Sequence, residues 1–206
     1  MIEHTFEFCS LQYLNHWFMH DKNYCKKLSS DDKNEKLKVL KSAGAFYKVA
    51  RNLPTEFEVK AKSRRYEPVL EIIDTLTQEQ FIDNPCTKIK EIAGAISDKY
   101  GERNVLSLTT KFLWLKIKSP ILIYDSQARI AVGANKNDIE DFYIKWHQEF
   151  NKYKTQIAQV CSKLSLLHLY VVDQNIGTAE YISKISSNPW FHERVFDIYL
   201  WNKGNS

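Results

Sequence analysis

Turn-forming residues are scarce in this chain, whose 206 residues include only 6 glycines and 5 prolines. Sandwiches and barrels need a turn after every short strand, so this scarcity disfavours an all-β fold and favours helices. No apolar run is long enough to cross a membrane, and the N-terminus MIEHTFE carries acids where a signal peptide carries an apolar stretch. We therefore expect a cytoplasmic protein with no membrane partner, associated with the nucleoid if it binds DNA.

Closely spaced cysteines are also missing. The chain has neither a CxxC motif nor a Cys-His cluster, and its cysteines lie far apart at Cys9, Cys25, Cys86 and Cys161. Zinc knuckles and four-cysteine iron–sulfur sites need ligands at short spacing, so we expect no metal and no cofactor. The cysteines are expected to be reduced thiols, as is usual in cytosolic proteins.

The composition is that of an ordinary globular protein, with 44% hydrophobic and 26% charged residues. The length allows one domain, or two small subdomains that share a cleft. The net charge of +4 is mild and compatible with a nucleic-acid surface. A local group of cations is either a solvated face or a contact for the DNA backbone. Such groups occur at Lys60, Lys62, Arg64 and Arg65, and at Lys111, Lys116 and Lys118.

Apolar residues recur at helical spacing through most of the chain, which predicts an all-α fold. The expected helices cover residues 6–20, 32–51, 68–75, 87–100, 104–116, 126–132, 138–164 and 189–203. Their starts are marked by capping residues: Asp32, Thr77, Thr87, Asp125 or Ser126, Asp138 and Asn188. Residues 166–172 are dense in leucine and β-branched side chains, so a helix and a buried strand are both open there.

One lysine and one aspartate suggest chemistry. Lys111 lies on the apolar segment TTKFLWL, and Asp125 follows the run PILIY and opens the next helix. Apolar surroundings favour the neutral, nucleophilic form of an amine, which can form a Schiff base with a sugar carbon. A carboxylate nearby can stabilise positive charge on that sugar. Taken alone, Lys111 could instead be a surface lysine, and Asp125 only a helix cap.

The order of elements around this pair is distinctive. Residues 94–133 contain a helix, a tight turn at residues 100–104, a second helix with Thr110 and Lys111, and then the string PILIYDS. This order resembles the helix-hairpin-helix DNA glycosylase superfamily, and within it the bacterial 8-oxoguanine-DNA-glycosylase-like group. The C-terminal stretch FDIYLWNKG resembles the closing helix of that group.

The resemblance implies two helical subdomains that flank a cleft, within one glycosylase-like domain over residues 1–206. The approximate subdomains are residues 1–86 with the C-terminal helices, and residues 87–165. It implies a DNA-repair enzyme that excises a damaged or modified base, an oxidised purine by resemblance, from double-stranded DNA. Lys111 would be the nucleophile, with AP-lyase activity through its Schiff base as a further step, and Asp125 would stabilise the transition state.

Further residues are expected to bind DNA or the extruded base. Arg129 lies one turn beyond Asp125, where a phosphate contact and a surface salt bridge are both open. The final helix lines the base pocket in related enzymes, so Phe191, Phe196 and Trp201 are candidates beside a role in the core. The remaining candidates are Tyr124 and Trp114 and, for the DNA backbone, Lys60, Lys62, Arg64 and Arg65.

The chain departs from the family at the hairpin. Where the family has a Gly-apolar-Gly turn, residues 106–109 read LSLT, and the spacing from lysine to aspartate is shorter. This departure favours a second hypothesis, a helical nucleic-acid-binding or protein-binding module without catalysis. A third hypothesis is a helical regulator in a defence or mobile-element system.

Overall fold

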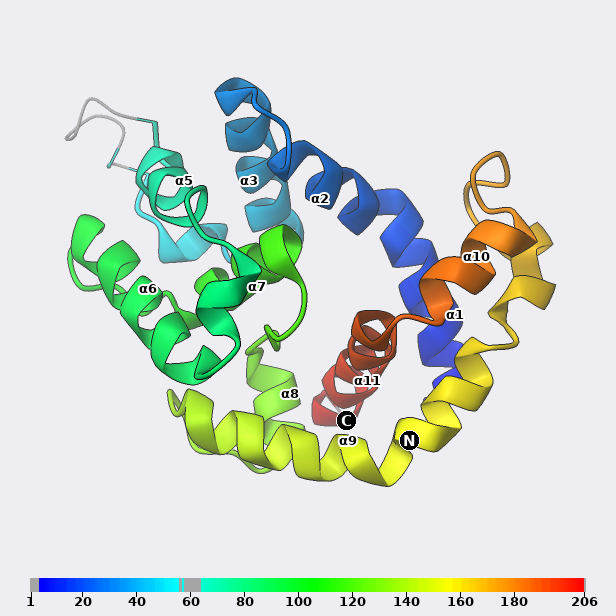
Figure 1. Ribbon diagram of the computed structural model, residues 1–206. Coiled ribbons are helices and arrows are strands. Elements are labelled where there is room, and N and C mark those ends of the chain that lie inside the picture. The colour runs from blue at the N-terminus through cyan, green and yellow to red at the C-terminus, as the bar shows by residue number, and fades with distance from the viewer. Residues whose placement is uncertain (1–3, 56, 58–63, 206) are drawn as a thin grey trace. The chain divides into compact units, whose positions relative to one another are not determined.

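The computed structural model describes residues 4–55, 57 and 64–205 (Figure 1). Within these residues the chain forms ten α-helices and no strand, which confirms the predicted all-α class. The chain divides into two compact units. Unit 1 comprises Met1–Asn23 and Asp125–Ser206, and unit 2 comprises Tyr24–Tyr124. These bounds differ from the predicted subdomains, although both divisions place the N-terminal and C-terminal helices together.

Unit 1 is built around its last helix, α11 (Pro189–Gly204). The four other α-helices that lie wholly in unit 1 all pack against it. Its inward side chains Phe191, Val195, Phe196 and Leu200 are almost fully buried, and burial of each stabilises the unit by about 1.5–3 kcal/mol. The other elements of unit 1 are α1 (Phe6–His16), η1 (Trp17–Asp21), α8 (Ser126–Ala131), α9 (Ile139–Cys161), η4 (Leu164–Tyr170) and α10 (Ala179–Ser186).

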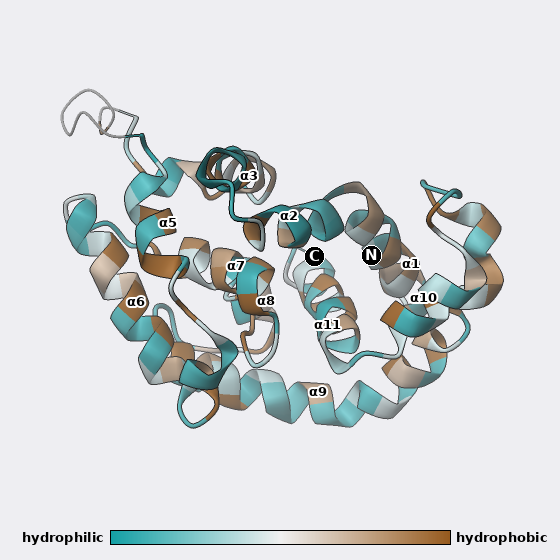
Figure 2. Cartoon of the chain, turned by 45° about the horizontal axis from the view of Figure 1, so that its top comes forward, coloured by the Kyte–Doolittle hydropathy of each residue, from teal (hydrophilic) through white to brown (hydrophobic). Residues whose placement is uncertain are grey.

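Helix α9 follows the predicted pattern of a long amphipathic helix. It begins after Asp138, whose carboxylate accepts a hydrogen bond from the Asp141 N–H. Phe142 and Trp146 lie on its buried side, and Figure 2 shows hydrophilic and hydrophobic residues alternating along its ribbon. The apolar stripe therefore faces the core of unit 1 while the polar residues face outward.

Unit 2 has α7 (Leu106–Ile117) as its most buried helix. All residues from Leu108 to Leu115 are buried, which is the pattern of a helix surrounded by others. The three other α-helices that lie wholly in the described part of unit 2 pack against it. The other elements of unit 2 are α3 (Lys33–Phe46), η2 (Ala50–Asn52), α5 (Glu67–Ile73), η3 (Gln78–Phe81) and α6 (Pro85–Lys99), while α2 (Lys22–Leu28) crosses the boundary between the units.

Most predicted helix starts are confirmed. Asp32 accepts hydrogen bonds from the Asn34 and Glu35 N–H groups at the start of α3, and Thr77 and Gln80 form the predicted capping box, here on a short 3₁₀ helix. Asn188 is the N-cap residue of α11, as predicted, and Pro189 is the first residue of the helix, although the Asn188 side chain forms no capping hydrogen bond.

Two local predictions are wrong. Asn84, not Thr87, caps α6, because Pro85 fits the first helical position and the Asn84 side chain accepts from the Thr87 N–H. The second error lies in helix α3, which was expected to run to about residue 51. It ends at Phe46, where Lys48 takes a positive φ of 56° and a separate 3₁₀ turn follows.

The stretch left open at residues 166–172 is neither a regular α-helix nor a strand. It lies largely in the 3₁₀ segment η4. Leu166 is 75% exposed and Tyr170 is 72% exposed, so the density of large apolar residues did not indicate a core element.

Candidate active site

Lys111 is held inside helix α7. The residue is only 5% exposed. Its Nζ donates a hydrogen bond to Ser107 Oγ one turn earlier (3.1 Å) and lies 5.9 Å from the centre of the Tyr47 ring. A hydroxyl oxygen and an aromatic ring face both stabilise an ammonium group. The interpretation of Lys111 as an exposed surface lysine is therefore wrong, and the prediction that an apolar helix holds it is confirmed.

The residues that precede Lys111 and Asp125 in the sequence are hydrogen-bonded to each other. The Tyr124 N–H donates to Thr110 Oγ1 at 3.1 Å, and both residues are buried. This bond holds the end of the PILIY segment against α7. Since consecutive Cα atoms lie about 3.8 Å apart, it also fixes the point at which the chain leaves unit 2 for Asp125.

Asp125 is the N-cap of α8, as predicted. Its backbone is extended, with φ −121° and ψ 147°, and its Oδ1 accepts a hydrogen bond from the Gln127 N–H at 3.0 Å. Capping occupies one carboxylate oxygen and fixes the side-chain rotamer. Arg129, one turn further on, donates through Nη1 to the Ala134 carbonyl (2.8 Å), so it ties the end of α8 to the following loop.

A buried ionic cluster on α11 was not predicted. Asp197 accepts hydrogen bonds from Arg194 Nη1 (2.8 Å) and from Trp146 Nε1 (2.9 Å). Burial raises the pKa of the Asp197 carboxyl, and the negative charge of Asp125 adds to that rise. The positive charge of Arg194 and the two hydrogen bonds oppose it. Acids placed inside the apolar stripe of a helix are the sequence signal that could have drawn attention to this cluster.

Glu193 belongs to the same cluster. Burial and the neighbouring Asp197 charge raise the pKa of its carboxyl to about 7. The Glu193 Oε2 atom is buried, and no atom of the described residues forms a hydrogen bond with it. A carboxyl in such surroundings is stabilised in its neutral form.

Most of the aromatic residues proposed to grip a base are core residues. Trp114 is 1% exposed, and Phe191 and Phe196 are fully buried. Phe196 contacts the ring of Trp146 at a centroid distance of 5.1 Å within unit 1. These three side chains fill the cores of their own units, whereas Trp201 is 44% exposed and is open to a ligand.

The predicted basic residues fall into different surroundings. Lys60 and Lys62 lie outside the described residues. Arg64 is exposed and donates through Nη1 to Asn34 Oδ1 (2.7 Å), while the Arg65 guanidinium donates to the carbonyls of Ala50 and Leu53. Both arginines therefore line the surface of unit 2 beside α3.

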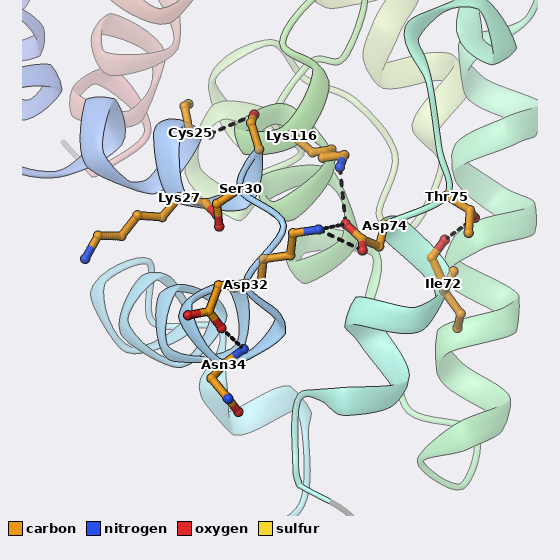
Figure 3. A network of polar contacts seen from close by, with 11 residues as sticks. Cys25, Lys27, Ser30, Asp32, Asn34, Ile72, Asp74, Thr75 and Lys116 are labelled. Atoms are coloured by element: carbon orange, nitrogen blue, oxygen red, sulfur yellow. Dashed lines mark hydrogen bonds and ion pairs between the residues drawn. The ribbon is translucent and has the colours of Figure 1, made fainter.

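Lys116, near the end of α7, is part of a partly buried ionic cluster and does not lie on a solvated basic face. Asp74 accepts hydrogen bonds from Lys36 Nζ (2.7 and 2.9 Å) and from Lys116 Nζ (3.3 Å). Figure 3 shows Lys116 pointing toward the Asp74 carboxylate. Burial alone would raise the pKa of this carboxyl, but the two lysines hold it below its usual range. The triad joins α3 and α7 to the C-terminal end of α5.

The hairpin between α6 and α7 turns earlier than in the family pattern. Gly101 (φ 76°) and Glu102 (φ 60°) make the turn, and the Asn104 carbonyl accepts a hydrogen bond from Asn52 Nδ2 at 2.7 Å. Residues 106–109 are the first turn of α7, with Leu108 and Thr109 buried. The backbone N–H groups of Leu108 and Thr109 are therefore not presented as a glycine turn would present them.

Neither a metal cluster nor a membrane span is found in the part of the chain that the structure describes. No group of three or more His, Cys, Asp and Glu side chains there could hold a metal ion. No helix there is both long and apolar enough to cross a membrane. The four cysteines are buried free thiols, and burial raises the pKa of Cys9 to about 11 and that of Cys161 to about 12.

Comparisons with family models, curated proteins and solved structures found no match to this chain. The class that the chain itself defines is an all-α protein of two contact units. Its candidate chemistry is a buried lysine on α7 and a capping aspartate that begins α8.

Proposed function

We propose that this protein is a DNA glycosylase that excises a damaged or modified base, an oxidised purine by resemblance, from double-stranded DNA. Lys111 is the nucleophile and Asp125 stabilises the positive charge that develops on the sugar. AP-lyase activity follows from the same lysine. The proposal requires both groups to reach one extruded nucleotide.

The observation that carries the proposal is the hydrogen bond from the Tyr124 N–H to Thr110 Oγ1. Thr110 and Tyr124 are the immediate predecessors of the two proposed reactive residues. A buried bond between them, with its donor and acceptor both shielded from water, holds the residue before Asp125 against α7 within unit 2. This attachment supports the proposal that the two following residues, an amine and a carboxylate, act in one reaction.

The chemistry suits these residue types. A deprotonated Lys111 amine attacks C1′ of the extruded nucleotide, the glycosidic bond breaks, and the base leaves with the bonding electrons and takes up a proton. Loss of a proton from nitrogen and opening of the sugar ring then give a Schiff base, with the former ring oxygen protonated to a hydroxyl. Removal of a C2′ proton expels the 3′ phosphate and cuts the strand.

Lys111 must lose a proton before it attacks. Two of its contacts, to Ser107 Oγ and to the Tyr47 ring, stabilise an ammonium group. A substrate that displaces the Ser107 contact would release the amine for reaction. The proposal therefore assigns Ser107 a positioning role: it holds the amine until the nucleotide enters.

The test is a panel of duplexes, each with one modified base, assayed for base release and strand cleavage. We expect activity on at least one oxidised-purine duplex, a loss of about a hundredfold or more in Lys111→Gln, and a smaller loss in Asp125→Asn. Lys99→Gln, an exposed change at the last residue of α6, is the matched control and should keep full activity. Full activity in a folded Lys111→Gln protein would contradict the nucleophile assignment.

A second candidate function is a helical nucleic-acid-binding or protein-binding module without catalysis. The observation that favours it is the hairpin, where Leu108 and Thr109 are buried within α7 instead of forming a glycine turn. Under this alternative, Lys111→Gln leaves DNA binding unchanged and no duplex in the panel loses a base.

A further inference from the structure

Unit 2 contains a groove between α3 and the residues that lead into α5. It has a volume of about 350 Å³. Its lining includes four cationic side chains and, among the described residues, no carboxylate. The lining residues are Asn34, Leu37, Lys38, Lys41, Arg64, Arg65 and Tyr66.

The floor of the groove is apolar and closely packed. Leu37 and Tyr66 are both 5% exposed. Tyr66 lies directly on α3 at Gly44, where a Cβ atom would come within 2.6 Å of the Tyr66 hydroxyl oxygen. Only glycine lets the ring approach the helix this closely, so Gly44 positions the aromatic floor.

Two of the four cations are held in place. Arg64 is fixed by its hydrogen bond to Asn34 Oδ1 (2.7 Å), and Arg65 by the carbonyls of Ala50 and Leu53. The acceptors of these printed bonds are a neutral amide and backbone carbonyls, and a guanidinium group stays protonated at neutral pH. The Glu67 carboxylate, two residues after Arg65, is paired with Lys33 Nζ at 2.5 Å and accepts a hydrogen bond from the Arg64 N–H at 3.3 Å.

The other two cations are available to a ligand. Lys38 and Lys41 are exposed and lie on the same face of α3, one turn apart. In the described part of the chain neither forms a hydrogen bond or an ion pair. Together with the two arginines they place four positive charges around one apolar floor, an arrangement that suits a ligand with several negative charges.

We propose that this groove binds phosphate esters, with Lys38 and Lys41 as the phosphate contacts and the arginines as fixed positive charge. Two sources supply this chemistry, the backbone of a nucleic-acid strand and a free nucleotide. The choice of a DNA strand as the first source to test rests on the proposed function. The phosphate chemistry itself rests only on the groove.

The experiment measures binding of a fluorescein-labelled duplex by anisotropy over a series of salt concentrations, and binding of adenosine monophosphate by calorimetry. Lys38→Gln/Lys41→Gln removes the two available charges at exposed positions, so the fold should be retained, as circular dichroism would show. The matched control is Lys154→Gln/Lys163→Gln, which removes two exposed charges from unit 1. Lys38→Arg/Lys41→Arg keeps the charge and should restore binding.

If the DNA backbone is the source, the double glutamine variant weakens duplex binding about tenfold or more at low salt. It also lowers the slope of log K against log salt by about 1 for each lost contact. If a free nucleotide is the source, adenosine monophosphate binds the wild type and the variant loses that binding, while duplex binding is unaffected. If neither probe responds to the substitutions, or if the control pair has the same effect, the proposal is overturned.

The result is separable from that for the glycosylase activity. If the protein binds duplex DNA through Lys38 and Lys41 but releases no base, the phosphate-binding groove is supported and the glycosylase proposal is contradicted. If the protein releases a base and its binding is unchanged by substitution of both lysines, the glycosylase proposal is supported and the phosphate-binding groove is contradicted.

Discussion

The Lys111 amine donates a hydrogen bond to Ser107 Oγ, one turn earlier in its own helix, at 3.1 Å. A buried charge depends strongly on such a partner, because water does not replace it fully. The same contact stabilises the fold and holds the proposed nucleophile in position. Its strength can be measured without knowledge of the substrate.

We expect Ser107→Ala to lower the free energy of unfolding by about 1–2 kcal/mol, since the hydrogen bond joins a charged donor to a hydroxyl in a partly buried site. Chemical denaturation gives this value. A double-mutant cycle with Lys111→Met should show a coupling energy of the same order. A coupling near zero would mean that the hydroxyl and the amine do not interact in solution.

Glu193 should give the protein a distinct pH dependence. Its folded pKa of about 7 is raised by burial and by Asp197, whereas an unfolded glutamate titrates at about 4.3. The stabilising contribution is therefore full below about pH 4.3 and is lost as pH rises through 7. This difference of between two and three pKa units corresponds to roughly 3 kcal/mol.

Glu193→Gln should remove this dependence. We expect the variant to match the wild type at pH 4.5 and to be up to roughly 3 kcal/mol more stable at pH 8, because glutamine is neutral at both values. Urea denaturation at several pH values measures this. The exposed Glu180→Gln on α10 is the control and should follow the wild type. Parallel curves for Glu193→Gln and wild type would contradict the raised pKa.

At the residue scale, predictions from the sequence succeeded where the partner is local. The cap at Asp125 depends on Gln127, and the burial of Lys111 follows from its apolar neighbours on α7. The environment of Asp197 could not be predicted, because its partner Trp146 lies on another helix, 51 residues away in the chain.

At the scale of elements, three helical segments of unit 2 meet at Asp74. Lys36 comes from α3 and Lys116 from α7, and their side chains are only 10% and 18% exposed. The Asp74 carboxylate follows the last turn of α5 and is 35% exposed. Removal of this carboxylate would leave two lysines close together without their shared anion.

Asp74→Asn should therefore destabilise the protein by about 1–2 kcal/mol at neutral pH, after allowance for solvent screening. Because the pKa of Asp74 is lowered in the folded protein, its contribution is present above the unfolded value of about 3.9 and is lost as pH falls through the folded value. Wild type should lose this stability below about pH 4, and the variant should not.

Lys27→Gln is the control for that experiment. The Lys27 Nζ and Glu35 Oε1 atoms are 4.0 Å apart, and both side chains are more than 40% exposed. Loss of this ion pair should therefore lower the free energy of unfolding by less than about 0.5 kcal/mol. An equal effect of the two substitutions would show that Asp74 is an ordinary surface carboxylate.

The C-terminal end of α11 lies directly on the start of α8. A Cβ atom at Gly204 would be 2.2 Å from the Gln127 carbonyl oxygen and 2.7 Å from its carbon, both backbone atoms that cannot swing away. Gly204→Ala should therefore destabilise unit 1 by about 1–3 kcal/mol. It should also lower the proposed activity, since α8 carries Asp125 at its N-terminus.

Gly94→Ala is the matched control for that substitution. Gly94 lies within α6, and nothing comes within 4 Å of a Cβ atom placed there. Alanine should therefore stabilise the helix by about 0.5–1 kcal/mol. Thermal unfolding of both variants shows directly whether each substitution raises or lowers the stability of the protein. If Gly204→Ala is neutral, α8 does not lie against α11 as the structure has it.

Helices were predicted well where periodicity and caps agree, as in α9 and α11. The prediction failed at residues 166–172, because leucine and valine density indicates burial only when other elements cover the segment. It also failed at the end of α3, where a turn at Lys48 replaces the last expected turn of helix. Such a turn depends on packing beyond the local sequence.

At the scale of the whole molecule, unit 1 combines the N-terminal residues with residues 125–206, and unit 2 is one continuous stretch. Periodicity along the sequence identifies helices but not which of them pack together. The bounds of the two units could therefore not be deduced from the pattern alone. The resemblance to a glycosylase supplied the expectation of two helical parts, and the contacts within the chain define the two units.

The proposed reaction forms one covalent bond that can be detected directly, between the Lys111 amine and C1′ of a nucleotide. Borohydride reduction during incubation with modified-base or abasic duplexes would trap the Schiff base as a stable amine. Peptide mapping of the adduct then identifies the attached lysine. The account predicts a protein–DNA adduct on Lys111 that is absent from a folded Lys111→Gln variant. An adduct on another lysine, or no adduct on any duplex with a folded wild-type protein, would contradict it.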